Sequence, residues 1–150
     1  MRKITSFCGL LLLALPAFGP AQETAPAALP RTASPDGALV YFLAPANGAT
    51  VTSPVTIRFG LRGMGVAPAG VTTANTGHHH LLIDVTELPP DNLPIPNDAT
   101  HKHFGAGQTE TELTLEPGKH TLQLVLGDAA HIPHQPPVRS EKITITVVAK

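Results

Sequence analysis

Proline and glycine set the strongest limit on how this chain folds, because sixteen prolines and thirteen glycines are spread over its 150 residues. Proline has no backbone N–H and breaks a helix interior, so prolines at this density exclude long helices. No apolar repeat of helical period is present either. Apolar residues instead alternate with polar ones over short stretches, as in VTIRFGLRG (55–63) and HTLQLVLGD (120–128). The chain is therefore expected to be all-β.

Turn signals divide the chain into about seven short strands, a pattern typical of an immunoglobulin-like antiparallel β-sandwich. In that topology residues 78–85 form strand C and residues 120–128 form strand F, which are antiparallel neighbours in one sheet. The remaining expected strands are 38–44, 55–63, 109–115 and 139–148, with 101–107 as a short strand or a bulged edge.

The N-terminal part of the chain is expected to lie outside the folded domain. Two basic residues precede an apolar run, and small residues follow it up to Ala21, as in a secretory signal peptide. We therefore expect residues 1–21 to be a signal peptide, residues 22–37 a flexible leader and residues 38–150 one domain. An uncleaved anchor is the alternative, although the apolar run is short for a membrane span. The mature protein is then expected to be periplasmic or secreted, with no membrane span.

Composition removes several classes of function. The single cysteine, Cys8, lies within the expected signal peptide, so the mature chain has no thiol for a disulfide, a nucleophile or a thiolate metal site. The net charge of −1, without a basic stripe, argues against nucleic-acid binding. The sequence contains neither a G-x-S-x-G elbow nor a Ser-His-Asp order, so nothing in it indicates a serine hydrolase.

Histidine is the main chemical feature of the mature chain, with eight copies. If strands C and F pair, the start of C lies beside the end of F. The B–C loop (64–77), the F–G loop (129–137) and the segment leading into 109–115 then share one pole of the sandwich. Seven histidines are expected to converge there: His78, His79, His80, His101, His103, His131 and His134, with Asp128 beside them.

Strand alternation sorts these histidines by direction. His78 and His80 are expected to point to one side of their strand, and His79 towards the core or its rim. His101 and His103 are expected to share a face in the same way. Two imidazoles on one strand face are well placed to bind one ion.

The predicted metal ligands are His78, His80, His101, His103, His131 and His134, with Asp128 and His79 as possible additional ligands. Imidazole with carboxylate suits Cu(II), Zn or Ni. Binding needs neutral imidazole, so the affinity is expected to fall below about pH 6. The alternative is a network of hydrogen bonds among these groups without an ion.

His120 is expected to lie at the opposite pole. The segment LEPGKHTLQLVLGDAA (115–130) resembles the E–F turn and F strand of bacterial immunoglobulin-like modules. In those modules a Gly-x-Tyr corner precedes the strand, and His120 stands in the place of the tyrosine. We expect it to be a structural residue that hydrogen-bonds the backbone.

Four segments together resemble a family of small exported bacterial proteins, domain of unknown function 4399: FGLRGMGVAPAG, NTGHHHLLID, HFGAGQTETELTL and GKHTLQLVLGDAAHIPH. The resemblance covers roughly residues 39–147, and Ala106 stands where the family usually has glycine. It implies an exported single-domain protein, and it implies no activity and no catalytic residue. The metal site is inferred from the histidines alone.

Three functions compete on these observations. The first is a periplasmic, non-catalytic module that binds a divalent metal. The second is a metal-free interaction module that holds a protein or glycan through its B–C and F–G loops. The third is a metalloenzyme, for which GHHH is only a loose match to the GxHxH of copper/zinc superoxide dismutase.

Overall fold

The structure is a computed structural model that describes residues 30–149, so the expected signal peptide lies outside the described residues. Between residues 30 and 149 there are nine strands and no helix. The strands are β1 Leu39–Ala44, β2 Thr50–Thr52, β3 Val55–Arg62, β4 Gly65–Val66, β5 Thr76–Ile83, β6 His101–His103, β7 Glu110–Leu113, β8 Gly118–Gly127 and β9 Ile143–Val148. The prediction of an all-β chain is confirmed.

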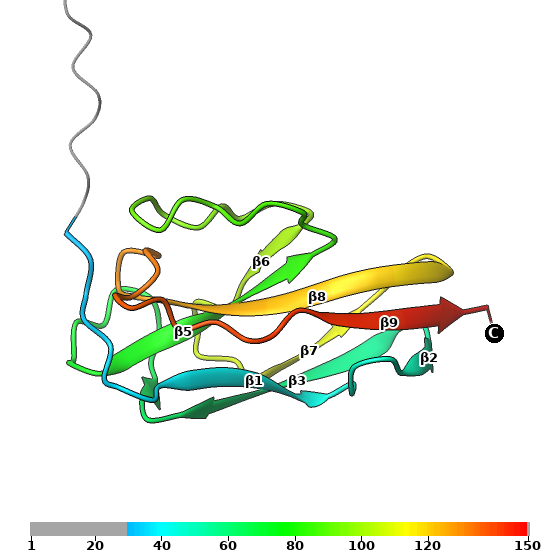
Figure 1. The fold of residues 1–150 in the computed structure, drawn as a ribbon, viewed down its shortest axis with the longest axis horizontal. Coiled ribbons are helices and arrows are strands. Elements are labelled where there is room, and N and C mark those ends of the chain that lie inside the picture. Colours follow the sequence, from blue (N-terminus) through cyan, green and yellow to red (C-terminus); the bar gives the residue numbers. More distant parts are fainter. Residues whose placement is uncertain (1–29, 150) are drawn as a thin grey trace, which may run out of the picture.

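The strands form two packed sheets, with β1 and β3 on one side of the molecule and β8 and β9 on the other (Figure 1). One sheet has the order β1-β3-β7, and the other has the order β2-β9-β8-β5-β4 with β6 paired to β5. β5 and β8 are antiparallel neighbours, and His78 at the start of β5 lies opposite Gly127 at the end of β8. The predicted pairing of strands C and F and the resulting sandwich are confirmed.

Two short strands lie in segments that were expected to be turn or loop. β2 pairs in parallel with β9, and β4 pairs in parallel with β5. They have three and two residues, too few to show an alternating pattern in the sequence. β9 also begins at Ile143 rather than at 139, because the Ser140 hydroxyl accepts the hydrogen bond of Leu124 N, 2.9 Å away, and so interrupts the ladder.

The core lies between the sheets and follows from the alternation seen in the sequence. The inward positions of β3, β8 and β9 that reach the core are apolar, and β5 contributes Leu81 and Ile83 beside the inward-facing His79. Burying one large aliphatic side chain contributes roughly 1.5–3 kcal/mol. The fully buried members are Val40, Ile57, Leu81, Leu122, Leu124, Leu126 and Ile145.

β5 is also covered on its outer face, which is what buries its histidines. Every residue from Gly77 to Ile83 is buried. On the outer face Leu82 and Val125 pack with Ile95, which comes from the long connection between β5 and β6. The F–G loop covers the end of β8, because Pro133 forms a bridge with Gly127. The sandwich therefore carries a third, irregular layer over this sheet.

Residues 31–34, which we call the N-terminal strap, fall in the segment predicted as leader. In Figure 1 this blue segment runs beside the orange F–G loop, and Ala33 forms a parallel bridge with Gln135. Ser34 N donates to the carbonyl of Gln135 at 3.0 Å, and Gln135 N donates to the carbonyl of Thr32 at 2.9 Å. These bonds attach this part of the expected leader to the domain.

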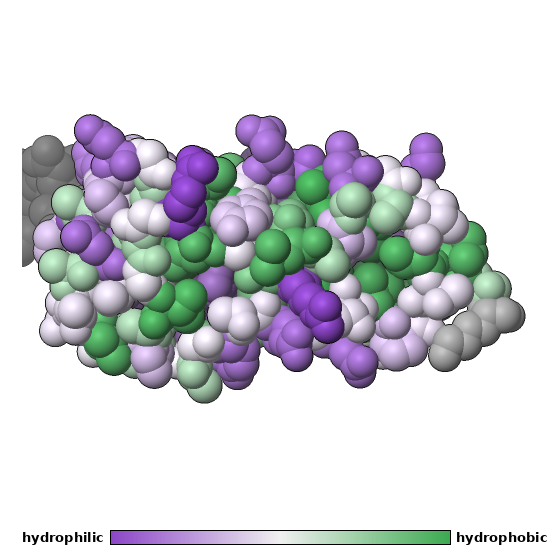
Figure 2. Space-filling view, turned by 90° about the horizontal axis from the view of Figure 1, so that it is seen from below, coloured by the Kyte–Doolittle hydropathy of each residue, from purple (hydrophilic) through white to green (hydrophobic). Residues whose placement is uncertain are grey.

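The face of the molecule seen from below Figure 1 mixes hydrophobic and hydrophilic side chains rather than presenting one continuous apolar surface (Figure 2). On β1 the side chains of Leu39, Tyr41 and Leu43 are exposed. Across residues 30–149, no helix is long and apolar enough to cross a membrane.

Candidate metal centre

The site begins with the alternation of β5. His79 points inward and packs on Phe59 of β3, with ring centroids 5.2 Å apart. His78 and His80 point outward together, and their Nε2 atoms are 3.0 Å apart. Both predicted directions are confirmed. The two outward rings are fully buried under the loop layer.

β6 adds a third imidazole, because its register with β5 places His103 directly opposite His80. Side chains of directly paired residues project from the same face of a sheet. The ring centroid of His103 is accordingly 5.1 Å from that of His80 and 4.9 Å from that of His78. Phe104, the next residue, turns inward against Phe59, with centroids 4.8 Å apart.

The F–G loop contributes a fourth imidazole. The ring of His131 lies edge-on to that of His78, with centroids 5.0 Å apart, and 4.6 Å from that of His103. Its centroid is 6.0 Å from that of His80. We call the rings of His78, His80, His103 and His131 the imidazole cluster. It joins two strands of one sheet and a loop more than 25 residues away in the sequence.

Two glycines make room for the cluster. A Cβ added at Gly127 would lie 2.8 Å from the Nε2 of His80, and one added at Gly105 would lie 2.6 Å from the Nε2 of His103. Both distances are below what real contacts tolerate. The backbone therefore acts as the wall against which two of the rings rest.

If the cluster holds a metal ion, Gly105→Ala is expected to weaken its binding about tenfold, because the new methyl group displaces the His103 ring, a change of about 1.4 kcal/mol. The stability should change little, since His103 is only half-buried and its ring can rotate. Gly70→Ala is not a fair control, because its φ of +83° strains any side chain. Gly65→Ala is the suitable control, since a Cβ at Gly65 would meet only ordinary van der Waals contacts. Calorimetric titration of the wild type, Gly105→Ala and Gly65→Ala with the metal ion measures the three affinities. Equal affinities for the wild type and Gly105→Ala would contradict the prediction.

Burial keeps the outward imidazoles neutral. It lowers the pKa of His78 to about 4 and that of His80 to about 2, and the neighbouring imidazoles act in the same direction. The pKa of His103 is lowered as well, first by burial and then by His131. A metal binds only neutral imidazole, so these rings are ready to bind at neutral pH without first losing a proton.

The geometry of three of these rings fits one cation. Ligand nitrogens of His78, His80 and His103 all lie within 4.8 Å of one another. Two nitrogens bound to one Zn²⁺ are about 3.3 Å apart in a tetrahedral site and about 2.9 Å apart at a right angle. The 3.0 Å separation of the two β5 nitrogens lies between these values. It also suits an N–H···N hydrogen bond.

A hydrogen bond between two rings leaves other nitrogens unused. The buried Nδ1 of His78, the Nδ1 of His80 and the Nε2 of His103 have no hydrogen-bond partner within residues 30–149. A buried polar group without a partner costs about 1–3 kcal/mol. The cluster thus has more lone pairs and N–H groups than its own hydrogen bonds can satisfy.

The other predicted ligands lie away from the cluster or are engaged elsewhere. His101 Nδ1 is 3.0 Å from Asp98 Oδ1. His134 is buried with its ring nitrogens 3.3 Å from the carbonyl of Leu126 and 3.2 Å from that of Thr76. The register of β6 explains the first case, because His101 pairs with Leu82, one outward position beyond His80.

Asp128, a possible additional ligand, is buried and bonded to the loop that follows it. Its Oδ1 accepts hydrogen bonds from Ala130 N at 2.9 Å and from Ile132 N at 3.0 Å. Its charge still reaches the cluster, where it opposes the lowering of the His78 pKa. His79, the other possible addition, faces the core.

His120 is the structural corner that the sequence predicts. Its Nε2 lies 2.8 Å from the carbonyl of Glu116, and its Nδ1 lies 2.7 Å from Asp84 Oδ2. The hydrogen bond to Asp84 is the main cause that raises the His120 pKa. Both ring nitrogens are engaged, so this His–Asp pair has no free nitrogen to act as a base. Asp84 itself was not predicted as a partner.

The residues that the sequence did not single out are Gly105 and Gly127. Gly105 lies two residues after His103, and Gly127 lies directly before Asp128. These positions indicate a role beside the histidine rings only once the pairing of the strands is known.

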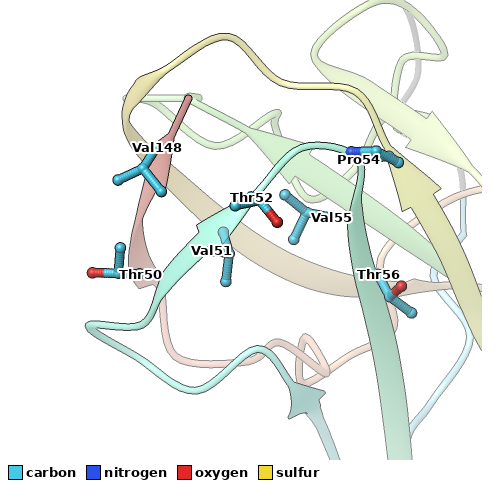
Figure 3. Close-up of a pocket in the computed structure, with 7 residues that line it drawn as sticks. All are labelled: Thr50, Val51, Thr52, Pro54, Val55, Thr56 and Val148. Atoms are coloured by element: carbon cyan, nitrogen blue, oxygen red, sulfur yellow. The ribbon is translucent and has the colours of Figure 1, made fainter. Parts of the chain in front are cut away.

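One open pocket lies at the far end of the sandwich, near the start of β8 rather than its end. It has a volume of about 410 Å³, and its lining is Thr50, Val51, Thr52, Pro54, Val55, Thr56 and Val148 (Figure 3). These side chains carry methyl and hydroxyl groups and no titratable group. The histidine chemistry is therefore separate from this cavity.

Comparisons with curated proteins and with solved structures found no match. A family model does match, over residues 57–148, and it is described as domain of unknown function (DUF4399). That span is more than half of the chain and includes every member of the imidazole cluster. The GHHHLLID, HFGxGQTE and GKHTLQLVLGD motifs lie within it. The chain belongs to the family of domain of unknown function DUF4399.

Proposed function

We propose that this protein is an exported, non-catalytic module that binds one divalent transition-metal ion. His78, His80 and His103 are its ligands, and His131 is the fourth. The observation that carries the proposal is the convergence of three neutral imidazoles, two fully buried and one half-buried, with nitrogens within 4.8 Å of one another.

The donor set indicates which ions fit. Ca²⁺ and Mg²⁺ prefer oxygen ligands, and the cluster offers imidazole nitrogens. Imidazole suits Cu(II), Zn and Ni. The absence of thiol from residues 30–149 removes the ligand that soft ions favour. Asp128 lies near enough to act on His78 and would offset part of the charge of a divalent ion.

A cation explains the cluster better than hydrogen bonds alone. Within residues 30–149, the two β5 rings are the members of the cluster that bond to each other, and the Nε2 of His103 has no hydrogen-bond partner. One ion accepts a lone pair from every ring at once. Binding to the folded protein alone also stabilises it, by about 4 kcal/mol when the free ion is 1,000 times its Kd.

His103→Ala tests this function. The tag-free chain is titrated with Zn²⁺, Cu²⁺ and Ni²⁺ by calorimetry at pH 7.5. The wild type is expected to bind one ion with a Kd of about 1 μM or tighter, and the variant at least about 100-fold more weakly, since it loses about 2.7 kcal/mol or more. His103 is half-buried at an edge strand, so its loss should leave the fold intact.

His101→Ala is the matched control, because it lies two residues away on the same short strand and bonds Asp98 instead. Its affinity should stay within about threefold of wild type. Binding no tighter than about 1 mM by the wild type, or equal losses in both variants, would refute the proposed site.

A second candidate function is a metal-free interaction module. The observation that favours it is the pairing of the B–C and F–G loops, where Gly70 N donates to the carbonyl of Ala129 at 3.0 Å. Val66 and Val71 of the B–C loop are exposed, and Val71 directly follows Gly70. Protein or glycan binding that is lost in Val71→Asp and unaffected by a chelator would support this candidate over the metal site.

A further inference from the structure

The F–G loop that carries His131 is held by one buried carboxylate. Asp128 is only 5% exposed, and its Oδ1 accepts from the amides of Ala130 and Ile132, the residues on either side of His131. Its second oxygen, Oδ2, accepts from the hydroxyl of Thr32 at 2.7 Å. Asp128 thus connects the N-terminal strap to the loop around His131.

His131 needs this support because of its backbone. Its φ is +67°, in the left-handed region that residues other than glycine rarely adopt. Its N–H donates to the carbonyl of Asp128 at 2.9 Å, and its own carbonyl accepts from Ile95 N at 2.8 Å. This conformation is what directs the His131 ring towards His78 and His103.

The strap adds further bonds to the same loop. Arg31 Nε donates to the carbonyl of Pro133 at 3.1 Å, and its guanidinium also donates to the carbonyl of His134. Arg31 precedes Thr32 in the strap and Ser34 follows it, and both residues bond to the F–G loop. Every one of these bonds lies outside the imidazole cluster itself.

We propose that Thr32 and Asp128 are positioning residues of the metal centre. Through them the strap holds His131 over the bound ion and slows the release of that ion. The inference rests on the proposed function, and it adds a role for a segment that the family match, residues 57–148, does not include.

Thr32→Val tests the inference in the full tag-free chain. Thr32 is exposed, so a valine of equal size removes the hydroxyl without disturbing packing. Release of Cu²⁺ or Ni²⁺ into excess EDTA is followed by stopped flow, and the Cu²⁺ visible and EPR spectra are recorded. We expect release about tenfold faster, with a spectrum shifted towards fewer nitrogen ligands.

Two matched variants separate positioning from general damage. Thr32→Ser keeps the hydroxyl and should restore the wild-type release rate and spectrum. Thr56→Val makes the same substitution on an exposed residue of β3, near the far cavity, and should behave as wild type. In the metal-free protein, amide exchange at Ala130 and Ile132 should be faster in Thr32→Val only.

The outcomes distinguish the two proposals. A wild type that binds no metal overturns both. A wild type that binds, with Thr32→Val releasing metal within twofold of its rate, overturns the positioning role and leaves the metal site standing. Faster amide exchange without faster metal release also overturns it, because the strap would then order the loop without acting on the ion.

Discussion

Lowering the pH from 7.5 to 5 is expected to reduce the free energy of unfolding of the metal-free protein by about 6 kcal/mol. Burial lowers the pKa of His78 and of His79 to about 4 and that of His80 to about 2. In the unfolded chain each returns to about 6.5. The folded state therefore stays unprotonated at pH 5 while the unfolded state binds protons.

The size of this effect follows from the unfolded chain. All three folded pKa values lie below 5. The free energy of unfolding lost at pH 5 is therefore set by how far pH 5 lies below the unfolded pKa of about 6.5, and it is about 2 kcal/mol for each imidazole. Stability contributed by these groups is complete above the unfolded value and is lost as the pH falls towards the folded values. His120 acts in the opposite direction, because its pKa is raised and its contribution is lost as the pH rises.

Urea unfolding at pH 7.5, 6 and 5, in the presence of EDTA, measures the loss. His79→Leu is the informative variant, because His79 packs on Phe59 and lies on the opposite side of β5 from the imidazole cluster. It should remove about a third of the pH dependence, one proton of three. A free energy of unfolding that is the same at pH 7.5 and 5 would contradict the burial of these imidazoles.

Gly77→Ala is expected to destabilise the fold by about 3 kcal/mol, the upper part of the range for overpacking. A Cβ at Gly77 would lie 2.7 Å from the carbonyl oxygen of Gly127 and 2.9 Å from both the Leu126 Cγ and the His134 Cε1. The first of these atoms is backbone and cannot rotate away. β5 and β8 would have to separate at the point where His78 is placed.

Gly65→Ala is the matched control for stability. Gly65 lies on the neighbouring strand, β4, and its Cβ would come no closer than 3.5 Å to any of its neighbours. We expect a change within about 0.5 kcal/mol. Thermal and chemical unfolding of both variants measures the difference. A Gly77→Ala protein as stable as Gly65→Ala would show that the β5–β8 contact is looser than the structure has it.

Much of the architecture was readable because it depends on local alternation. The apolar positions of residues 55–63 and 120–128 have the period of a strand, and the observed β3 and β8 bury those positions. β2 and β4 were missed, because strands of three and two residues have no period to read. They form because longer neighbours offer a free edge.

The candidate site was readable in part. Alternation along β5 separates His79 from its two neighbours, and pairing with β8 brings the F–G loop close. The register between β5 and β6 could not be predicted from the sequence. It decides which histidine joins the cluster, because His103 pairs with His80 whereas His101 pairs with Leu82. The partners of His134 and Asp128 were hidden for the same reason, since backbone carbonyls and amides have no sequence signature.

The sequence by itself determined the all-β class, the directions of the histidines along their strands, the corner role of His120 and the family. These follow from backbone periodicity and from motifs that lie within one segment. Only the tertiary structure decided which imidazoles meet, that Gly105 and Gly127 make room for them, and that the N-terminal strap supports the loop of His131. Those features depend on register and on contacts between distant segments, such as the 96 residues between Thr32 and Asp128. The histidines of β5 thus belong to a candidate site only together with β6 and the F–G loop, which lie beside them.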